Sequence, residues 1–274
     1  MAKDKKKKKP GRTMAQAADK HDLYERSVQC VDAEIDFVDN TFQQLRQRVP
    51  HQLREDFCGT TNTSCEWVKR RDDNIAHCVD LDAGVLDWGR RNKIARLEED
   101  AASRMHLYND NVLTAEVRPM DIVLAMNFSY WLFKSCEDMQ RYFRRVHAGL
   151  VDDGIFFLDA FGGYEAFQEM EESTKYNGFT YIWDQAKYNP ITGDFTCHIH
   201  FKFKDGSRLR NAFTYEWRLW TLPELTRMLR NCGFRPTVYW EGTDKNGEGN
   251  GVFTPTDQGE ADAGWIAYIV AEKV

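Results

Sequence analysis

The stretch LREDFCGTTNTSCEWVKR, from Leu53 to Arg70, decides the fold that the sequence predicts. Its first residues are typical of a β-strand, Cys58-Gly59-Thr60-Thr61 indicates a tight turn, and a helical pattern follows. In α/β proteins such a turn can hold a nucleotide, because its backbone N–H groups face the ligand. This turn has one glycine where two or three are usual, so it is a working ligand loop, a degenerate one or only a turn.

The sequence around this stretch alternates between strand patterns and helix patterns. Beyond the strand that begins at Leu53, strand patterns occur at 75–82, 105–110, 121–126, 154–161, 234–243 and 264–273. The stretch GIFFLDAF is an uninterrupted apolar run of the kind that is buried on both faces. We therefore predict an α/β fold with a doubly wound, mostly parallel sheet of seven strands.

The predicted domains are a disordered Lys-rich tail, an N-terminal helical lid and a main domain, at residues 1–20, 21–50 and 51–274. The lid helix is expected to begin at Asp22. A β-rich insertion is expected after the fifth strand, at about 176–220, with a hairpin that turns at Gly206 through a three-residue loop. The polar, glycine-rich stretch 245–264 is expected to be a loop.

The charge of the chain is unevenly distributed. The net charge is −6, although the first twelve residues hold seven basic side chains and one acidic side chain. The rest of the chain is therefore strongly acidic, which is a poor match to a phosphate backbone. We predict that nucleic acid is not the partner. The tail itself is expected to be a solvated arm, with nucleic-acid contact and nuclear targeting as alternatives.

The cysteines and the hydropathy pattern indicate a reducing, cytoplasmic location. The seven cysteines contain no CxxC pair, so neither a disulfide framework nor a zinc site is expected. No apolar run of membrane-spanning length occurs, and no apolar segment follows the N-terminal lysines as in a secretory signal. His198 and His200 share a strand face without a third ligand at matching spacing, so we predict no metal. The oligomeric state stays open.

Asp80 stands at the end of the next strand, 21 residues after Gly59. That spacing is typical of a carboxylate that accepts hydrogen bonds from two ribose hydroxyls. Asp82 is better placed to cap the following helix, which leaves Asp80 free for a ligand. A pyrophosphate would need further glycines at Phe57 and Thr61, so the loop favours a nucleoside without a pyrophosphate, and NAD is the weakest candidate.

These motifs resemble those of the class I S-adenosylmethionine-dependent methyltransferases. Cys58-Gly59-Thr60 matches the core of the family's first motif, Asp80-Leu81 matches the ribose-binding acid and its adenine-packing neighbour, and Asn127-Phe128-Ser129-Tyr130 matches the motif beside the methyl donor. The resemblance implies a Rossmann-like methyltransferase fold and S-adenosyl-L-methionine as the cofactor. The implied cofactor-binding residues are Tyr24, Glu55, Phe57, Cys58, Gly59, Thr60, Asp80, Leu81, Asp110, Asn111, Val112 and Asn127. Phe57 is expected to narrow the methionine end of that site.

The acceptor is expected to be a small molecule. Asn127 lacks the Pro-Pro-aromatic sequence that follows this position in the family's enzymes for nucleobase amines. The β-rich insertion instead resembles the glycine N-methyltransferase-like branch, so an amine or a carboxylate is favoured over a nucleobase. The substrate-binding candidates are Tyr130, Trp131, Trp183 and Arg218. No catalytic residue is assigned, because methyl transfer mainly needs alignment of the reactants.

Two alternatives to a small-molecule methyltransferase stay open. One is a tRNA or protein methyltransferase that uses the lysine tail as an anchor. The other is a non-catalytic regulator, in which the altered loop binds S-adenosylmethionine without turnover.

Overall fold

The computed structural model describes residues 11–245, 247 and 249–274. Residues 1–10 of the predicted disordered tail lie outside this range. Residues 11–20, which belong to the same predicted tail, are structured: they contain helix α1 (Met14–Ala17), capped by Thr13, and the first residue of helix α2 (Lys20–Val28). The prediction of a tail that extends to residue 20 was therefore wrong at its C-terminal end.

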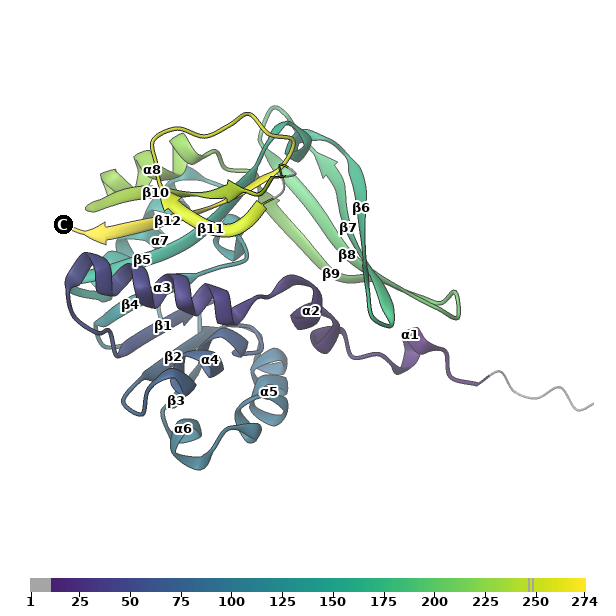
Figure 1. Ribbon diagram of the computed structural model, residues 1–274, viewed down its shortest axis with the longest axis horizontal. Helices are drawn as coiled ribbons and strands as arrows, with labels where there is room; N and C mark the ends of the chain where they lie inside the picture. The colour runs from purple at the N-terminus through teal and green to yellow at the C-terminus, as the bar shows by residue number, and fades with distance from the viewer. Residues whose placement is uncertain (1–10, 246, 248) are drawn as a thin grey trace, which may run out of the picture.

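A mixed β-sheet forms the centre of the fold (Figure 1). Within the described residues it has eight strands in the order β11-β10-β12-β5-β4-β1-β2-β3. The strands are β1 (Gln52–Asp56), β2 (Ile75–Asp80), β3 (Met105–Asn109), β4 (Met120–Ala125), β5 (Leu150–Gly162), β10 (Phe234–Thr243), β11 (Gly249–Pro255) and β12 (Trp265–Lys273). Strands β1 to β5 are parallel, and β12, β10 and β11 form an antiparallel edge. The predicted Rossmann-like sheet is confirmed.

The eighth strand, β11, lies in the stretch that was expected to be a loop. It pairs antiparallel with β10, from Thr243 opposite Gly249 to Tyr239 opposite Pro255. Phe253 explains part of its order, because its ring lies 4.3 Å from that of Tyr268 on β12. An aromatic contact of this kind and a backbone ladder offset the entropy of ordering a glycine-rich segment.

Helices cover both faces of the main sheet. On one face lie α3 (Val31–Arg46) and α4 (Asn62–Arg70), and on the other lie α7 (Cys136–Ala148) and α8 (Leu222–Asn231). The remaining helical elements are α5 (Ala83–Asn92), α6 (Glu99–Ser103) and the 3₁₀ turns η1 (Ile94–Arg96), η2 (Ser129–Leu132) and η3 (Tyr164–Phe167). Alternate residues of β4 are buried against opposite layers, as in a doubly wound sheet. None of the helices in the described part of the chain is long and apolar enough to cross a membrane.

The β-rich insertion is a separate antiparallel sheet rather than a hairpin. Its strands, in order, are β6 (Met170–Tyr176), β7 (Phe179–Tyr188), β8 (Asp194–Phe203) and β9 (Arg208–Arg218). The second sheet begins at Met170, whereas the sequence analysis expected the insertion to begin at about residue 176. The three-residue loop at Gly206 is confirmed, since Lys202 pairs with Arg208 and Gly206 has a φ of 81°. The register then shifts at a bulge near left-handed Asn211, which the sequence analysis did not predict.

The segment predicted to be an N-terminal lid contains two helices rather than one. Helix α2 begins at Lys20 because Asp19 accepts hydrogen bonds from the backbone N–H groups of His21 and Asp22, and it ends at Val28. Helix α3 begins at Val31. The prediction of one helix that begins at Asp22 was therefore wrong. Figure 1 shows α2 between the second sheet and the end of the main sheet near α5.

Helix α5 packs very closely on the turn that follows β1. A Cβ atom at Gly89 would lie 2.5 Å from the backbone oxygen of Thr60. Backbone atoms cannot move aside as a flexible side chain can, so only glycine fits at this position. This contact fixes the distance between α5 and the turn.

We expect Gly89→Ala to destabilise the protein by about 1–3 kcal/mol through overpacking. Gly84→Ala, in the first turn of the same helix, is the matched control, because its Cβ would meet only the Asp82 side chain, at 3.1 Å. Urea unfolding of both variants measures the difference. Equal stability of the two variants would show that the contact at Gly89 does not constrain the fold.

Candidate active site

The turn after β1 has the left-handed backbone angles of a glycine-rich loop, although Gly59 is its one glycine. Phe57, Gly59 and Thr61 have φ angles of 57°, 52° and 64°. Left-handed φ costs a residue other than glycine roughly 1–2 kcal/mol, and it is least favourable for a β-branched side chain such as that of Thr61. The loop therefore has the conformation that glycines would adopt at positions 57 and 61.

The side chain of Phe57 is half-buried and packs against the hydrophobic core. Its ring lies 5.7 Å from that of Tyr142 and 6.2 Å from that of Phe133. The narrowing of the methionine end by this ring stays a prediction. The Thr60 hydroxyl donates to Glu25 Oε1 at 2.6 Å, and the Thr61 hydroxyl lies 3.8 Å from Cys65 Sγ.

Asp80 holds the turn in place. Its Oδ2 accepts a hydrogen bond from the Gly59 N–H at 2.8 Å, and its Oδ1 accepts one from the Asp82 N–H at 2.9 Å. A carboxylate has about four acceptor positions, so two remain for a ligand. Asp82 caps α5 through the N–H groups of Gly84 and Val85, as the sequence predicted.

The neighbouring predicted residues fit a nucleoside. Leu81 follows Asp80 and is 72% exposed, which is unusual for a large apolar side chain and suits stacking against a flat ring. Asp110 follows β3 and accepts hydrogen bonds through Oδ1 from the Asn111 N–H and the Thr114 hydroxyl. Val112 is buried, and its carbonyl accepts from Arg54 Nη2 at 3.0 Å. These residues could hold an adenosine group at this end of the sheet.

Glu55 stabilises the turn through hydrogen bonds to α4. It is buried, and its Oε2 accepts hydrogen bonds from the backbone N–H and the hydroxyl of Ser64 on α4. Burial raises the pKa of its carboxyl to about 8. Glu55 therefore positions the start of α4, and so the turn, from within the protein interior. Cys58 is buried beside it.

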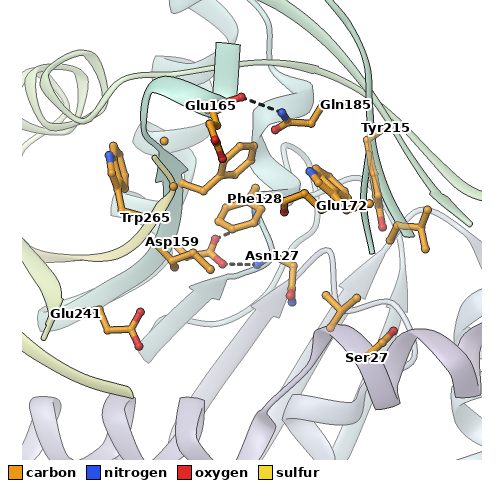
Figure 2. Close-up of a pocket in the computed structure, with 18 of the residues that line it drawn as sticks. Ser27, Asn127, Phe128, Asp159, Glu165, Glu172, Gln185, Tyr215, Glu241 and Trp265 are labelled. Atoms are coloured by element: carbon orange, nitrogen blue, oxygen red, sulfur yellow. Dashed lines mark hydrogen bonds between the residues drawn. The ribbon is translucent and has the colours of Figure 1, made fainter. Parts of the chain in front are cut away.

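A cavity of about 650 Å³ opens beside the end of β4, between the main sheet, the second sheet and α2 (Figure 2). Of the predicted site residues it is lined by Tyr24, Asn127 and Trp183. The Tyr24 ring lies 5.0 Å from that of Phe213 of β9, which links α2 to the second sheet. The remaining aromatic lining residues are Phe128, Phe161, Tyr181, Trp217, Phe253, Trp265 and Tyr268.

The charged side chains that line this cavity are all acidic. They are Glu34, Asp159, Glu165, Glu172 and Glu241, and none of the described lining residues is Lys, Arg or His. The combination of carboxylates and aromatic rings favours a cationic ligand, because both attract positive charge.

Asp159 fixes the edge of the cavity next to β4. Its two oxygens accept hydrogen bonds from the backbone N–H groups of Asn127 at 2.7 Å and Phe128 at 2.9 Å (Figure 2). Both of those residues have a φ of 57°. Burial raises the pKa of Asp159 to about 7. The sequence contained a signal for this residue, because it is the one acid within the apolar run GIFFLDAF.

Three of the four predicted substrate residues lie elsewhere. Tyr130 and Trp131 are fully buried, and the Tyr130 hydroxyl donates to the Asp159 carbonyl at 2.6 Å. Arg218 bonds to Glu224 Oε1 and to the Lys134 carbonyl, and its guanidinium stacks on Trp220. We therefore assign these three side chains to the core and to the start of α8 rather than to a substrate pocket.

His200 is part of the second sheet's hydrogen-bond network. Its Nδ1 accepts from the Asn211 N–H at 2.8 Å, so its Nε2 donates to Asp184 Oδ2 at 3.1 Å. His200, Asp184 and Glu171 form a group whose potential metal-ligand atoms lie within 4.8 Å of one another. His198 bonds to Thr214 instead.

The fold is that of S-adenosylmethionine-dependent methyltransferases of known structure. No family model and no curated protein matches the sequence. Such a methyltransferase from Clostridium acetobutylicum aligns with a TM-score of 0.68 at 14% identity, over 92% of this chain and 97% of its own. An amino pentose methyltransferase from Micromonospora echinaspora, involved in calicheamicin biosynthesis, aligns with a TM-score of 0.66 at 14% identity, over 93% and 96%. A sugar N-methyltransferase from Streptoalloteichus aligns with a TM-score of 0.62 at 14% identity, over 100% and 98%.

We expect Asp80→Ala to weaken the binding of S-adenosylhomocysteine by roughly tenfold or more, because it removes a charged acceptor from the site. Asp82→Ala is the matched control. It removes the cap of α5 at a cost of about 1 kcal/mol of stability but leaves the affinity for the nucleoside unchanged. Calorimetric titration measures both affinities. Full affinity in Asp80→Ala would contradict the assignment of Asp80.

We expect the free energy of unfolding to fall by about 2 kcal/mol between pH 7 and pH 9. Burial raises the pKa of Glu34, Glu55 and Asp159 to about 7, about 8 and about 7. Each group binds its proton more tightly in the folded state, so its stabilising effect is lost as pH rises through the folded pKa.

Urea unfolding across this pH range measures that loss. Glu55→Gln keeps an oxygen for Ser64 and cannot ionise, so its stability should fall about 1 kcal/mol less than that of the wild type. Parallel curves for the two proteins would contradict the elevated pKa of Glu55.

Proposed function

We propose that the protein transfers a methyl group from S-adenosylmethionine to an amine of a small molecule. The observation that carries this proposal is the aromatic cavity beside Asn127, whose charged lining residues are all acidic. A carboxylate acceptor would be repelled by those residues, whereas an ammonium group would be attracted. The similar structures of an amino pentose methyltransferase and a sugar N-methyltransferase support the amine class.

The donor end of the site is proposed at the carboxyl ends of β1 to β4. Asp80 would accept the ribose hydroxyls, Leu81 would pack on the adenine, and Asp110 would accept its amino group. The N–H groups of the left-handed turn around Gly59 would face the rest of the ligand. S-adenosylmethionine supplies a methyl group that is already activated by the positive sulfur.

The protein's own contribution is alignment and exclusion of water. Helix α2 closes the site, because Glu25 bonds to Thr60 on the turn and to Lys93 after α5, at 2.6 and 2.9 Å. The ring of Tyr24, one residue earlier, contacts Phe213 of the second sheet. Positioning of this kind can contribute about 7–11 kcal/mol to lowering a bimolecular barrier.

The other functions are less well supported. The acidic body favours neither tRNA nor an acidic protein as substrate, and the lysine tail lies outside the described residues. A regulator that only binds the nucleoside would not need a cavity lined by carboxylates next to the donor site. A cytoplasmic location is proposed because the seven cysteines are all free.

A thermal-shift comparison tests the donor. S-adenosylmethionine and S-adenosylhomocysteine at a hundred times Kd should each stabilise the protein by about 2.7 kcal/mol, and NAD should not. A shift with NAD alone would contradict the proposal.

Formation of S-adenosylhomocysteine with a panel of amines, and with the matching alcohols and carboxylates, tests the acceptor. We expect turnover with amines only. Turnover confined to carboxylates would contradict the amine assignment, and donor binding without turnover of any acceptor would favour the regulator.

A further inference from the structure

Glu34 lies in the first turn of α3 and lines the cavity with only 8% of its surface exposed. Among the described residues, its Oε2 atom has no hydrogen-bond partner. A buried carboxylate oxygen without a partner costs several kcal/mol in general, so such an atom usually has a purpose. Burial raises the pKa of Glu34 to about 7, and only the backbone of Cys30 opposes this effect.

Within the described part of the chain, the titratable groups that interact with Glu34 from the surrounding elements provide no positive charge. They are Tyr24 from α2, Glu55 from β1, Asp159 from β5 and Tyr268 from β12. Each is an acid or a neutral hydroxyl. A cation that enters the cavity would therefore find an uncompensated negative site rather than an existing ion pair.

The competing carboxylates of Asp159, Glu241 and Glu172 are less suited to bind a ligand, and Glu165 is less buried than Glu34. Both oxygens of Asp159 accept backbone hydrogen bonds. Glu241 Oε1 accepts from the Gly251 N–H at 2.8 Å. Glu172 is exposed at the rim, where water screens its charge. Glu34 combines a buried position with an oxygen that has no hydrogen-bond partner among the described residues.

We propose that Glu34 binds the ammonium group of the acceptor and takes its proton before methyl transfer. This assignment rests on the proposed function. The nitrogen of the ammonium loses one proton to the Glu34 carboxylate and so regains its lone pair. The lone pair then forms the bond to the methyl carbon while the carbon–sulfur bond breaks and its electrons stay on sulfur. Glu34 later releases the proton to solvent.

Calorimetric titrations in the presence of S-adenosylhomocysteine test this role without turnover. The probes are benzylammonium and its neutral analogue benzyl alcohol. The wild type should bind the ammonium roughly tenfold or more tightly than the alcohol, because a charge-assisted bond is gained. Glu34→Gln should lose that preference and keep its affinity for the alcohol. Near pH 7 the wild type should also release protons on binding benzylammonium, and Glu34→Gln should not.

Two comparison variants make the result specific. Glu171→Gln changes an exposed acid of β6 outside the cavity and should keep the wild-type preference. The proposal is overturned if the wild type shows no preference for the ammonium, or if Glu241→Gln loses the preference while Glu34→Gln keeps it. Folding of Glu34→Gln is checked by its Tm above pH 7, which should exceed that of the wild type because a buried charge is removed.

The same titrations separate this inference from the proposed function. Failure of S-adenosylhomocysteine to bind the wild type would contradict methyl transfer, whatever the amines do. Donor binding with no ammonium preference would contradict the role of Glu34 alone.

Discussion

The carboxylate of Asp159 is the interaction on which the site depends. It accepts the backbone N–H groups of Asn127 and Phe128, and both of these residues have left-handed φ angles. The strain costs roughly 1–2 kcal/mol for each residue, and a hydrogen bond to a charged group contributes about 1.5–3 kcal/mol. The two effects are of similar size, so the hydrogen bonds of Asp159 offset the backbone strain in the corner after β4, which is formed by Asn127 and Phe128. That corner separates the proposed donor side from the acidic cavity.

The alternation of strands and helices and the turn after the first strand could be predicted because they depend on local sequence. A strand, the Cys58-Gly59-Thr60 turn and a helix are adjacent in the chain, and Asp80 follows at a fixed spacing. The backbone conformation at Phe57 and Thr61 could not be predicted, because these side chains disfavour a left-handed φ. Tertiary contacts stabilise this conformation. The Phe57 ring packs against Tyr142, and Gly89 of α5 lies against the backbone of Thr60.

The cavity beside Asn127 depends on contacts between distant segments, and of the four substrate candidates from the sequence only Trp183 lines it. The alternation along a strand places Trp183 on one face but does not say whether that face meets a core or a cavity. Tyr130 and Trp131 occur in the right motif, yet their rings fill the core below the corner. Glu34 stands between apolar neighbours of α3, so its position on a buried face was visible, but the cavity was not.

Charge connects the stability of this fold to its proposed activity. The cavity gathers buried carboxylates whose pKa values burial raises, and no cationic side chain among the described lining residues compensates them. An apolar cavity would make a more stable protein. Two bound cations would change this balance: the positive sulfur of the donor and the ammonium of the acceptor would each meet negative charge. After transfer the sulfur is neutral, so the product nucleoside loses that attraction and can leave. The buried carboxylates destabilise the protein when no cation is bound. The site would therefore bind the two charged reactants more tightly than the neutral product nucleoside.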